Sequence, residues 1–220
     1  YKFKREGDDR RIIAGSIESG TLNIGDEVLF LPSKKQSVIK QFEVFNAPET
    51  EQQEAGEAIG LTLQEQVYVQ RGDVLCKKKE TLPYVTTKFQ ANVFWMGRQA
   101  FEEGKSYKLK LGPQEVPVQL KQVHHVLDAS TLNEEKKRLL ERHEVASCTL
   151  ECKKPVAFDT VDRLAGTSRF VIVDGYLISG GGIITAAEAD VAATAREEAL
   201  RRELHWEKGL VSLKNRMTRY

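Results

Sequence analysis

The sequence predicts an all-β protein: two antiparallel β-barrels in series, followed by a C-terminal α-helix. Over most of residues 1–185, apolar residues alternate with polar ones at a period of two, and glycine-containing turns interrupt the alternation every few residues. Closing a sheet into a barrel removes exposed strand edges, so many short strands remain stable in water. Residues 186–220 are instead rich in alanine, glutamate and arginine, a composition that favours a helix.

The first barrel is expected over residues 1–83. Its strands are predicted, from alternation and the turns that bound them, at 10–17, 21–24, 27–31, 38–45, 58–63 and 74–76. Arg71-Gly72-Asp73 spells a cell-adhesion tripeptide, but its place before a strand indicates a turn, in which glycine supplies a positive φ and aspartate caps the backbone. The charged, proline-containing stretch at 77–83 predicts the boundary between the barrels.

The second barrel is expected over residues 84–185. Its strands are predicted at 89–95, 107–111, 116–127, 145–152, 170–173 and 183–184. The apolar parity switches near Gln122, which predicts a β-bulge. Residues 134–142 are expected to form a short helix with Leu139 and Leu140 facing inward. The run Gly180-Gly181-Gly182 predicts a bulge or a sharp bend rather than a phosphate loop, because no lysine and no helix start follows it directly.

The third segment, residues 186–220, is predicted to be a helix and a linker. Thr185 and Glu188 have the spacing of a capping box, and the helix is expected to run to about Trp206. It has a narrow apolar face, so it is expected to dock on a partner domain or act as a spacer; that face consists of Val191, Ala195, Leu200 and Leu204. The basic cluster beyond it is interpreted as a solvated linker and comprises Lys208, Lys214, Arg216 and Arg219.

The cysteines and histidines do not form a recognisable site in the sequence. Cys148 and Cys152 fall on the apolar face of a predicted strand, where small core residues are expected and a thiol pair or a metal site is the alternative. His124 and His125 are neighbours on a predicted strand, so their side chains should point to opposite faces and not chelate one ion. Cys76 completes an odd cysteine count that fits a reducing compartment.

Charge and hydropathy limit the function classes. The 220 residues include 33 basic and 32 acidic side chains, and the net charge of +1 provides no broad basic field for nucleic acid. No apolar run of about 18 residues predicts a membrane span, and the charged start does not match a signal peptide, so a cytoplasmic location is expected. The start at Tyr1 and the open basic end suggest a piece of a longer protein. Neither G-x-x-x-x-G-K-[ST] nor Asn-Lys-x-Asp occurs, so no GTP or ATP site of those types is predicted.

Residues 10–28 read RRIIAGSIESGTLNIGDEV and contain the pattern G-x-[IV]-x-x-G-x-[IL]-x-x-G-[DE]. This stretch resembles the opening hairpin of the second domain of translation-type GTPases. Residues 55–61 and 71–75 resemble later strands of that domain, in the expected order.

The second half resembles one branch of the same superfamily, the GTPase subunit of bacterial sulfate adenylyltransferase. The resemblance rests on FQANVFWM at 89–96 and on the segments 107–110, 143–159 and 169–174, and with the first half it covers about residues 5–184. The opening Phe-x-Ala-x-x-x-Trp-Met is its most discriminating part. Two departures stand out: His143 replaces an asparagine usual in the branch, and residues 175–182 replace a threonine-asparagine-rich strand end.

The resemblance implies barrels of the translation-factor domain 2 and domain 3 type. It implies a non-catalytic barrel fragment that couples nucleotide state to a partner subunit, within a parent that makes adenylylsulfate from ATP and sulfate while hydrolysing GTP. GTP, ATP and Mg²⁺ then belong to the parent, and no catalytic, cofactor or metal residue is assigned to this chain. The residues expected at interdomain or partner interfaces are Arg71, Asp73, His143, Arg169 and Gly181.

The implied partners are the chain's own GTPase domain and the ATP-sulfurylase catalytic subunit. Residues 196–216 are similar to the segment that joins this GTPase to an adenylylsulfate kinase domain in bifunctional forms, which makes that domain a third expected partner. The main alternative is a tRNA-binding or protein-binding pair of barrels from a translation elongation factor-like GTPase. A further alternative, that the chain is itself an enzyme, finds no supporting constellation of residues.

Overall fold

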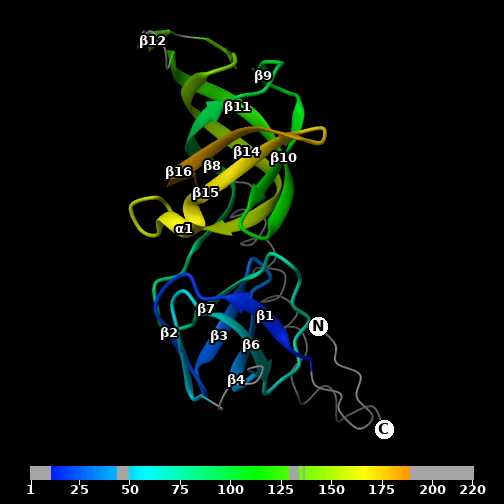
Figure 1. Ribbon diagram of the computed structural model, residues 1–220, viewed down its shortest axis with the longest axis vertical. Coiled ribbons are helices and arrows are strands. Elements are labelled where there is room, and N and C mark those ends of the chain that lie inside the picture. The colour runs from blue at the N-terminus through cyan, green and yellow to red at the C-terminus, as the bar shows by residue number, and fades with distance from the viewer. Residues whose placement is uncertain (1–10, 44–49, 129–133, 136, 189–220) are drawn as a thin grey trace, which may run out of the picture. The chain divides into compact units, whose positions relative to one another are not determined.

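Strands dominate the chain, as the all-β prediction requires. The computed structural model describes residues 11–43, 50–128, 134–135 and 137–188. Within these residues the elements are strands β1 to β16 and one short helix, α1, at Ala165–Ser168. The order of the elements can be followed along the chain in Figure 1.

The first seven strands form the first barrel region. They are β1 (Ile13–Ser16), β2 (Thr21–Asn23), β3 (Glu27–Leu31), β4 (Lys35–Glu43), β5 (Gln52–Glu54), β6 (Ala58–Leu63) and β7 (Val74–Lys77). Five of them form an antiparallel sheet in the order β1-β6-β4-β3-β7, and β2 pairs with β5. Alternation in β3 sends Val28 and Phe30 into the core of this region, together with Ile39, Phe42 and Leu61.

The remaining strands form the second barrel. They are β8 (Tyr84–Trp95), β9 (Phe101–Glu102), β10 (Ser106–Leu111), β11 (Gln114–Asp128), β12 (Glu134–Glu135), β13 (Leu139–Leu140), β14 (Glu144–Phe158), β15 (Arg169–Asp174) and β16 (Leu177–Ala187). Six pair in the order β10-β15-β16-β8-β14-β11, and β11 pairs back to β10, so the barrel is closed and has no free edge among these strands. Figure 1 shows them wrapped around a common interior.

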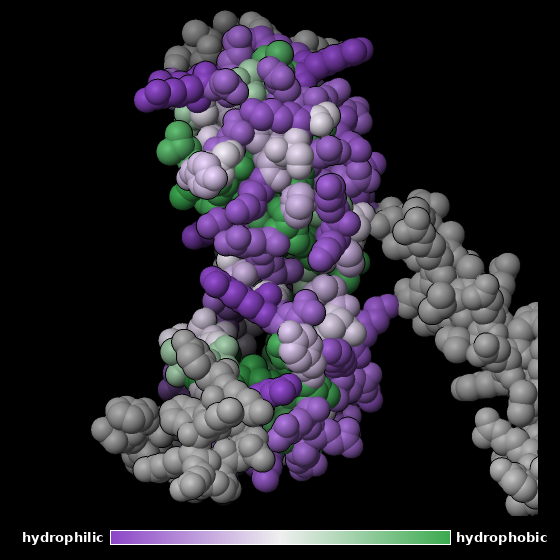
Figure 2. Space-filling view, turned by 90° about the vertical axis from the view of Figure 1, so that its right-hand side faces the viewer, coloured by the Kyte–Doolittle hydropathy of each residue, from purple (hydrophilic) through white to green (hydrophobic). Residues whose placement is uncertain are grey.

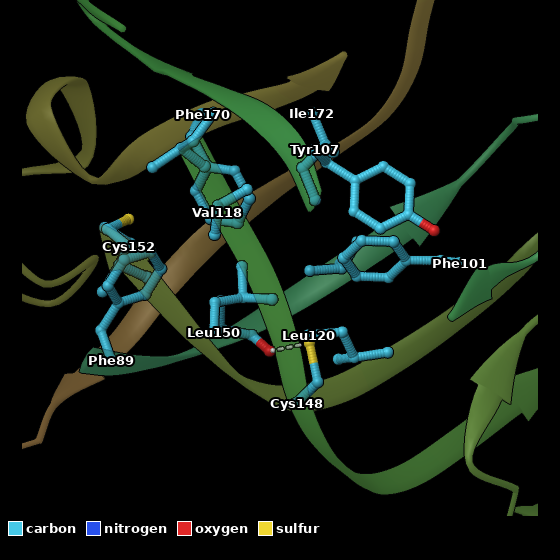
Figure 3. Packing of buried hydrophobic residues seen from close by; sticks show 14 of the residues in the cluster. Phe89, Phe101, Tyr107, Val118, Leu120, Cys148, Leu150, Cys152, Phe170 and Ile172 are labelled. Carbon is cyan, nitrogen blue, oxygen red and sulfur yellow. Dashed lines mark hydrogen bonds between the residues drawn. The ribbon is translucent and has the colours of Figure 1, made fainter. Parts of the chain in front are cut away.

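The interior of the second barrel is filled with aromatic and aliphatic side chains. Figure 3 shows Phe89, Phe170 and Val118 on one side of this core and Phe101 with Tyr107 on the other. Trp95 stacks on Phe101 with ring centroids 4.7 Å apart. The interior is therefore a packed core rather than a ligand cavity.

A third apolar cluster joins residues from the two halves of the chain. Leu29 and Leu31 of β3 are buried together with Ala157 of β14, and Val74, Cys76 and Val85 pack against them. Strand β3 is thus covered on both faces, which explains its nearly continuous apolar sequence.

The bulge predicted near Gln122 is confirmed. The β11–β14 pairing shifts register between Leu120 and Gln122. A second shift occurs between Val123 and His125, so His124 is itself the extra residue of a bulge, which the sequence pattern did not reveal. Its ring lies 2.9 Å from the Thr149 hydroxyl, measured at Nε2.

Two helix predictions are corrected by strand pairing. The helix expected at 134–142 is wrong: Glu134 and Glu135 pair with β11, and Leu139 and Leu140 pair with β9. Leu140 is fully buried there, and long-range pairing with that burial overrides the local helical preference.

The second correction concerns the capping box at Thr185. Strand β16 continues through Thr185 to Ala187, and Ala186 and Ala187 pair with Gln90 and Phe89 of β8. The rest of the predicted helix lies outside the described residues, as do its apolar face and the basic cluster beyond it. Among the described residues, no helix is long and apolar enough to cross a membrane.

Candidate partner-binding surfaces

The five residues expected at interfaces fall into two groups. Arg71 and Asp73 flank Gly72 in the turn that precedes β7, whereas His143, Arg169 and Gly181 all belong to the second barrel. In the β15–β16 pairing, Gly181 lies opposite Val171 and Arg169 opposite Ile183. Paired residues of antiparallel strands share a face, so Arg169 and Gly181 lie on one face of the sheet, about 7 Å apart along the strands.

The turn at Arg71-Gly72-Asp73 has the structure that its sequence predicts. Gly72 has φ +99°, the Asp73 backbone N–H donates to the Gln70 carbonyl at 3.1 Å, and the Asp73 carboxylate accepts the Gln70 N–H at 3.1 Å. A Cβ at Gly72 would stand 2.9 Å from Cγ of Gln114, so the turn also lies against the start of β11. These contacts give the turn a structural role, and Arg71 stays exposed beside it.

Gln114 supports the same region. It is buried, donates from Nε2 to the Ala157 carbonyl at 2.8 Å, and accepts the Ala157 N–H through Oε1 at 3.2 Å. Its amide therefore acts as a one-residue strand partner for β14, next to the cluster of Leu29 and Leu31.

His143 occupies a backbone conformation that few residues adopt. Its φ is +73°, in the left-handed region where asparagine is favoured among non-glycine residues. The His143 N–H donates to the Trp95 carbonyl at 2.8 Å, which fixes the turn to the end of β8. An asparagine, which the resemblance leads us to expect here, would suit this conformation, and the exposed imidazole forms none of these contacts that hold the turn among the described residues.

A buried carboxylate holds the same turn from the other side. Glu144 is 6 % exposed; its Oε2 accepts the Glu141 N–H at 2.7 Å, and its Oε1 lies 2.7 Å from Nζ of Lys137. The buried charge is paired and hydrogen-bonded, as burial requires.

The glycine run leaves room for two aromatic rings. A Cβ at Gly180 would stand 2.7 Å from Cε3 of Trp95, and a Cβ at Gly182 would stand 2.6 Å from Cζ of Phe170. The β15–β16 pairing also shifts register between Ile172 and Val173, beside this run. The predicted need for glycine is confirmed at Gly180 and Gly182, whereas the extra residue of the bulge is the neighbouring Ser179.

Gly181 has a different consequence. It lies opposite Phe94 of β8 on the outer face of the sheet, and it has no side chain to cover that ring. Phe94 is consequently 37 % exposed although it stands in the middle of a sheet. Met96, two residues further on, is also exposed, and its N–H donates to the Ser179 carbonyl at 2.8 Å.

The β15–β16 hairpin adds three more exposed apolar residues. Its turn is formed by Gly175, with φ +61°, and Tyr176. Tyr176 is fully exposed, and Leu177 and Ile178 are 69 % and 62 % exposed. We define the hairpin surface as Phe94, Met96, Tyr176, Leu177 and Ile178. Sequence reasoning missed it, although three consecutive apolar residues directly after a hairpin glycine were the available signal.

The surroundings of the hairpin surface are polar. Figure 2 shows another view of the molecular surface, in which hydrophilic residues cover most of the described part and hydrophobic ones appear in smaller areas between them. Near the hairpin, Lys105 forms an ion pair with Asp174 at 2.7 Å, and this contact raises the pKa of Lys105. A shallow groove lined by Val116, Pro117 and Val173 reaches the turn at Gly175.

Two of the three cysteines are core residues, and Cys76 is half-buried. Cys148 and Cys152 are buried in β14 and face the core, as Figure 3 shows, and Cys148 donates weakly to the Ala91 carbonyl at 3.7 Å. Burial raises the pKa of each of these thiols to about 12, and burial together with nearby Asp159 and Glu80 raises the pKa of Cys76 to about 11. All three are free thiols, and protonated thiols are poor nucleophiles and metal ligands.

The described residues offer no group of three or more histidine, cysteine, aspartate or glutamate side chains arranged to hold a metal ion.

Comparison with known families matches both halves of the chain. Residues 10–76 match the family model described as elongation factor Tu domain 2, and residues 88–185 match the one described as GTP-eEF1A C-terminal domain-like. The two matches lie in the order that the sequence patterns predict.

Several relatives are bacterial proteins named sulfate adenylyltransferase subunit 1. The protein from Shewanella woodyi is 32 % identical over 76 % of this chain, and those from Laribacter hongkongensis and Chromobacterium violaceum are each 30 % identical over 88 % and 89 % of it. The chain spans 35 %, 40 % and 42 % of these three relatives, well under half of their length. The resemblance to the sulfate adenylyltransferase branch is confirmed.

The fold is shared with solved structures of sup35. The structure of sup35 complexed with GDP superposes with a TM-score of 0.76 at 21 % identity, covering 86 % of this chain and 46 % of that one. Its complex with GMPPNP gives a TM-score of 0.74 at 20 % identity, covering 81 % and 44 %. Residues 10–76 therefore belong to the elongation factor Tu domain 2 family and residues 88–185 to the GTP-eEF1A C-terminal domain-like family, the two barrel domains that translation-type GTPases carry in series.

Proposed function

We propose that this chain is the two-barrel part of a GTP-hydrolysing sulfate adenylyltransferase subunit and that it couples the nucleotide state of that subunit to a partner subunit. The observation that carries the proposal is the similarity to proteins named sulfate adenylyltransferase subunit 1, which extends over 76–89 % of the chain and so includes residues of both barrels. A subunit numbered one implies at least one other subunit, which we take to be the ATP-sulfurylase catalytic subunit.

The chemistry is assigned to other parts of the parent protein. GTP, ATP and Mg²⁺ would be bound there, because these 220 residues contain no phosphate-loop sequence. In this proposal the barrels are non-catalytic and act through surfaces, with Arg71, Asp73, His143, Arg169 and Gly181 at or beside interdomain or partner contacts.

The domain limits are part of the same proposal: a domain 2 barrel at 1–83, a domain 3 barrel at 84–185, and a helix and linker at 186–220. The linker would lead to an adenylylsulfate kinase domain, as the similarity of residues 196–216 suggests. A cytoplasmic location follows from the proposed pathway step, which uses ATP and GTP.

Binding to the catalytic subunit tests the proposal directly. The full 220-residue chain and its full-length parent are each immobilised and presented with the purified ATP-sulfurylase catalytic subunit from the same organism. We expect the parent to bind, and the chain to retain part of that affinity. If neither binds, the proposed coupling role is wrong.

The family relationship to elongation factors favours one alternative, in which the barrels bind tRNA. The net charge of +1 provides little of the electrostatic attraction that phosphate binding requires. Submicromolar tRNA binding that weakens steeply with salt would replace our proposal with this alternative.

A further inference from the structure

We propose that the hairpin surface is the apolar centre of the contact with the partner subunit, and that the partner presents an apolar pocket with an acidic rim. The inference rests on the proposed function, which supplies the partner. It goes further by naming the surface and the chemistry of what covers it.

The side chains of the hairpin surface favour a protein over a nucleic acid. Tyr176 is fully exposed at the turn, and the two exposed residues that follow it, Leu177 and Ile178, carry no charge. Phosphate backbones are bound through lysine, arginine and backbone N–H groups, whereas tyrosine is among the residues enriched as anchors of protein interfaces.

The surface extends from β16 to the end of the neighbouring strand β8. Ile178 pairs with Val173 of β15 and so shares its face, while the N–H of Met96, directly after the end of β8, donates to the carbonyl of Ser179, next to Ile178. Phe94 extends the same face because its neighbour Gly181 leaves it uncovered. Phe94, Met96 and Ile178 therefore lie on one face with Tyr176 at the adjoining turn, whereas Leu177, the strand neighbour of Ile178, alternates to the other face.

Two exposed arginines border this area. Arg98 follows Met96 by two residues, and Arg142 precedes His143, whose N–H binds the Trp95 carbonyl. Both arginines are exposed, and neither forms an ion pair with another described residue. The nearby carboxylates are already used, since Asp174 pairs with Lys105 and Glu144 with Lys137. A complementary partner would therefore place aspartate or glutamate around its apolar pocket.

The size of the surface argues against a second copy of this chain as the occupant. The four of its side chains that lie together, Phe94, Met96, Tyr176 and Ile178, expose about 400–600 Å² if each large side chain offers roughly 150–250 Å² when fully exposed. Two copies joined through these side chains would bury about 800–1,200 Å² in total, at or below the lower limit of stable interfaces. As the centre of a larger contact with a different protein, with the arginines at its rim, the same area is sufficient.

The hairpin is held in place before binding. The ion pair between Lys105 and Asp174 anchors the residue just before the turn, and Trp95 packs against Gly180 just beyond it. A pre-ordered anchor lowers the entropy cost of association.

The test compares surface variants of the full 220-residue chain in binding to the purified catalytic subunit. The double variant Tyr176→Ser, Ile178→Thr should weaken binding roughly 10- to 100-fold. The double variant Arg98→Glu, Arg142→Glu should also weaken binding, and the loss of affinity should be larger at low salt than at high salt. The matched controls are Tyr68→Ser, another exposed tyrosine, and Lys153→Glu, another exposed cation; both should bind as the unmodified chain does. Thermal unfolding of each variant checks that it is folded.

The outcomes separate this inference from the proposed function. If the unmodified chain binds and the hairpin variants bind equally well, the surface is wrong while the proposed function stands. If neither the chain nor its parent binds, both are wrong. Loss of tRNA binding or of self-association, instead of subunit binding, in the hairpin variants would also overturn the inference by identifying a different occupant.

Discussion

The indole ring of Trp95 lies against the backbone of Gly180, so that a Cβ at position 180 would stand 2.7 Å from Cε3 and 3.0 Å from Cζ3 of the ring. Trp95 is fully buried, stacks on Phe101, and donates from Nε1 to the Gln99 carbonyl at 2.7 Å. The ring therefore has little freedom to move aside. The tryptophan and the glycine, 85 positions apart in the sequence, form one packing unit at the base of the hairpin.

Gly180→Ala should consequently destabilise the protein. The added methyl group overpacks a filled core, which costs about 1–3 kcal/mol of unfolding free energy. Gly181→Ala is the control, because its nearest neighbour is the Phe170 carbonyl oxygen at 3.5 Å, an ordinary contact. Chemical denaturation of both variants measures the difference, and equal stabilities would contradict the packing argument.

The left-handed backbone at His143 leads to a second prediction. His143→Asn should preserve stability or raise it by a few tenths of a kcal/mol, whereas His143→Val should lower it by about 1–2 kcal/mol, because a β-branched residue is strained at φ +73°. Thermal unfolding should rank the stabilities in the order Asn, His, Val, with the asparagine variant the most stable. If valine were as stable as histidine, the imidazole itself rather than the backbone would explain this position.

Strand positions were predictable where one face of a strand is buried and the other is exposed to solvent. Alternation placed Glu27–Leu31 and Ala58–Leu63 with their observed ends, and the parity switch near Gln122 located a bulge. The helix prediction for 134–142 was wrong because the structure there depends on residues far away in the sequence. Leu140 pairs with Phe101, and no local pattern encodes that pairing. Similarly, Thr185 and Glu188 satisfy a local capping pattern, but strand β16 continues to pair with β8 as far as Ala187.

The candidate surfaces were predicted less completely. The turn at Gly72 and the glycine run follow from the conformations and contacts that only glycine allows. The exposure of Phe94 does not follow from its own sequence neighbourhood, because it results from Gly181 on an adjacent strand. Arg169 and Gly181 share a face only once the β15–β16 register is known.

A third prediction concerns Gln114. Gln114→Leu should remove both hydrogen bonds to Ala157 and leave its buried N–H and carbonyl without partners, at a cost of about 2–4 kcal/mol in unfolding free energy. Gln119→Leu, in the same strand, is the control, since Gln119 makes one exposed contact of 3.3 Å with the Gly104 carbonyl. Urea denaturation distinguishes the two variants. A Gln114→Leu protein as stable as the Gln119→Leu protein would show that the amide pairing contributes nothing.

The buried thiols predict a loss of stability at alkaline pH. The pKa values of Cys148 and Cys152 are raised by burial from 9.0 to about 12, so between those values the unfolded chain ionises its thiols while the folded one keeps them protonated. The unfolded state then binds fewer protons, and the unfolding free energy falls as pH rises through this window.

Because each fully ionised thiol contributes about 1.4 kcal/mol per pH unit, the two together should cost the protein about 2–3 kcal/mol between pH 8 and pH 10. Lysine and tyrosine titrate in the same range, so the measurement compares the unmodified chain with a Cys148→Ala and Cys152→Ala double variant, which retains every other titrating group. The variant starts from a lower stability at pH 8 because two core groups are truncated, but its unfolding free energy should fall less steeply with pH. Parallel curves would mean that both thiols keep ordinary pKa values, and hence that solvent reaches them within the barrel.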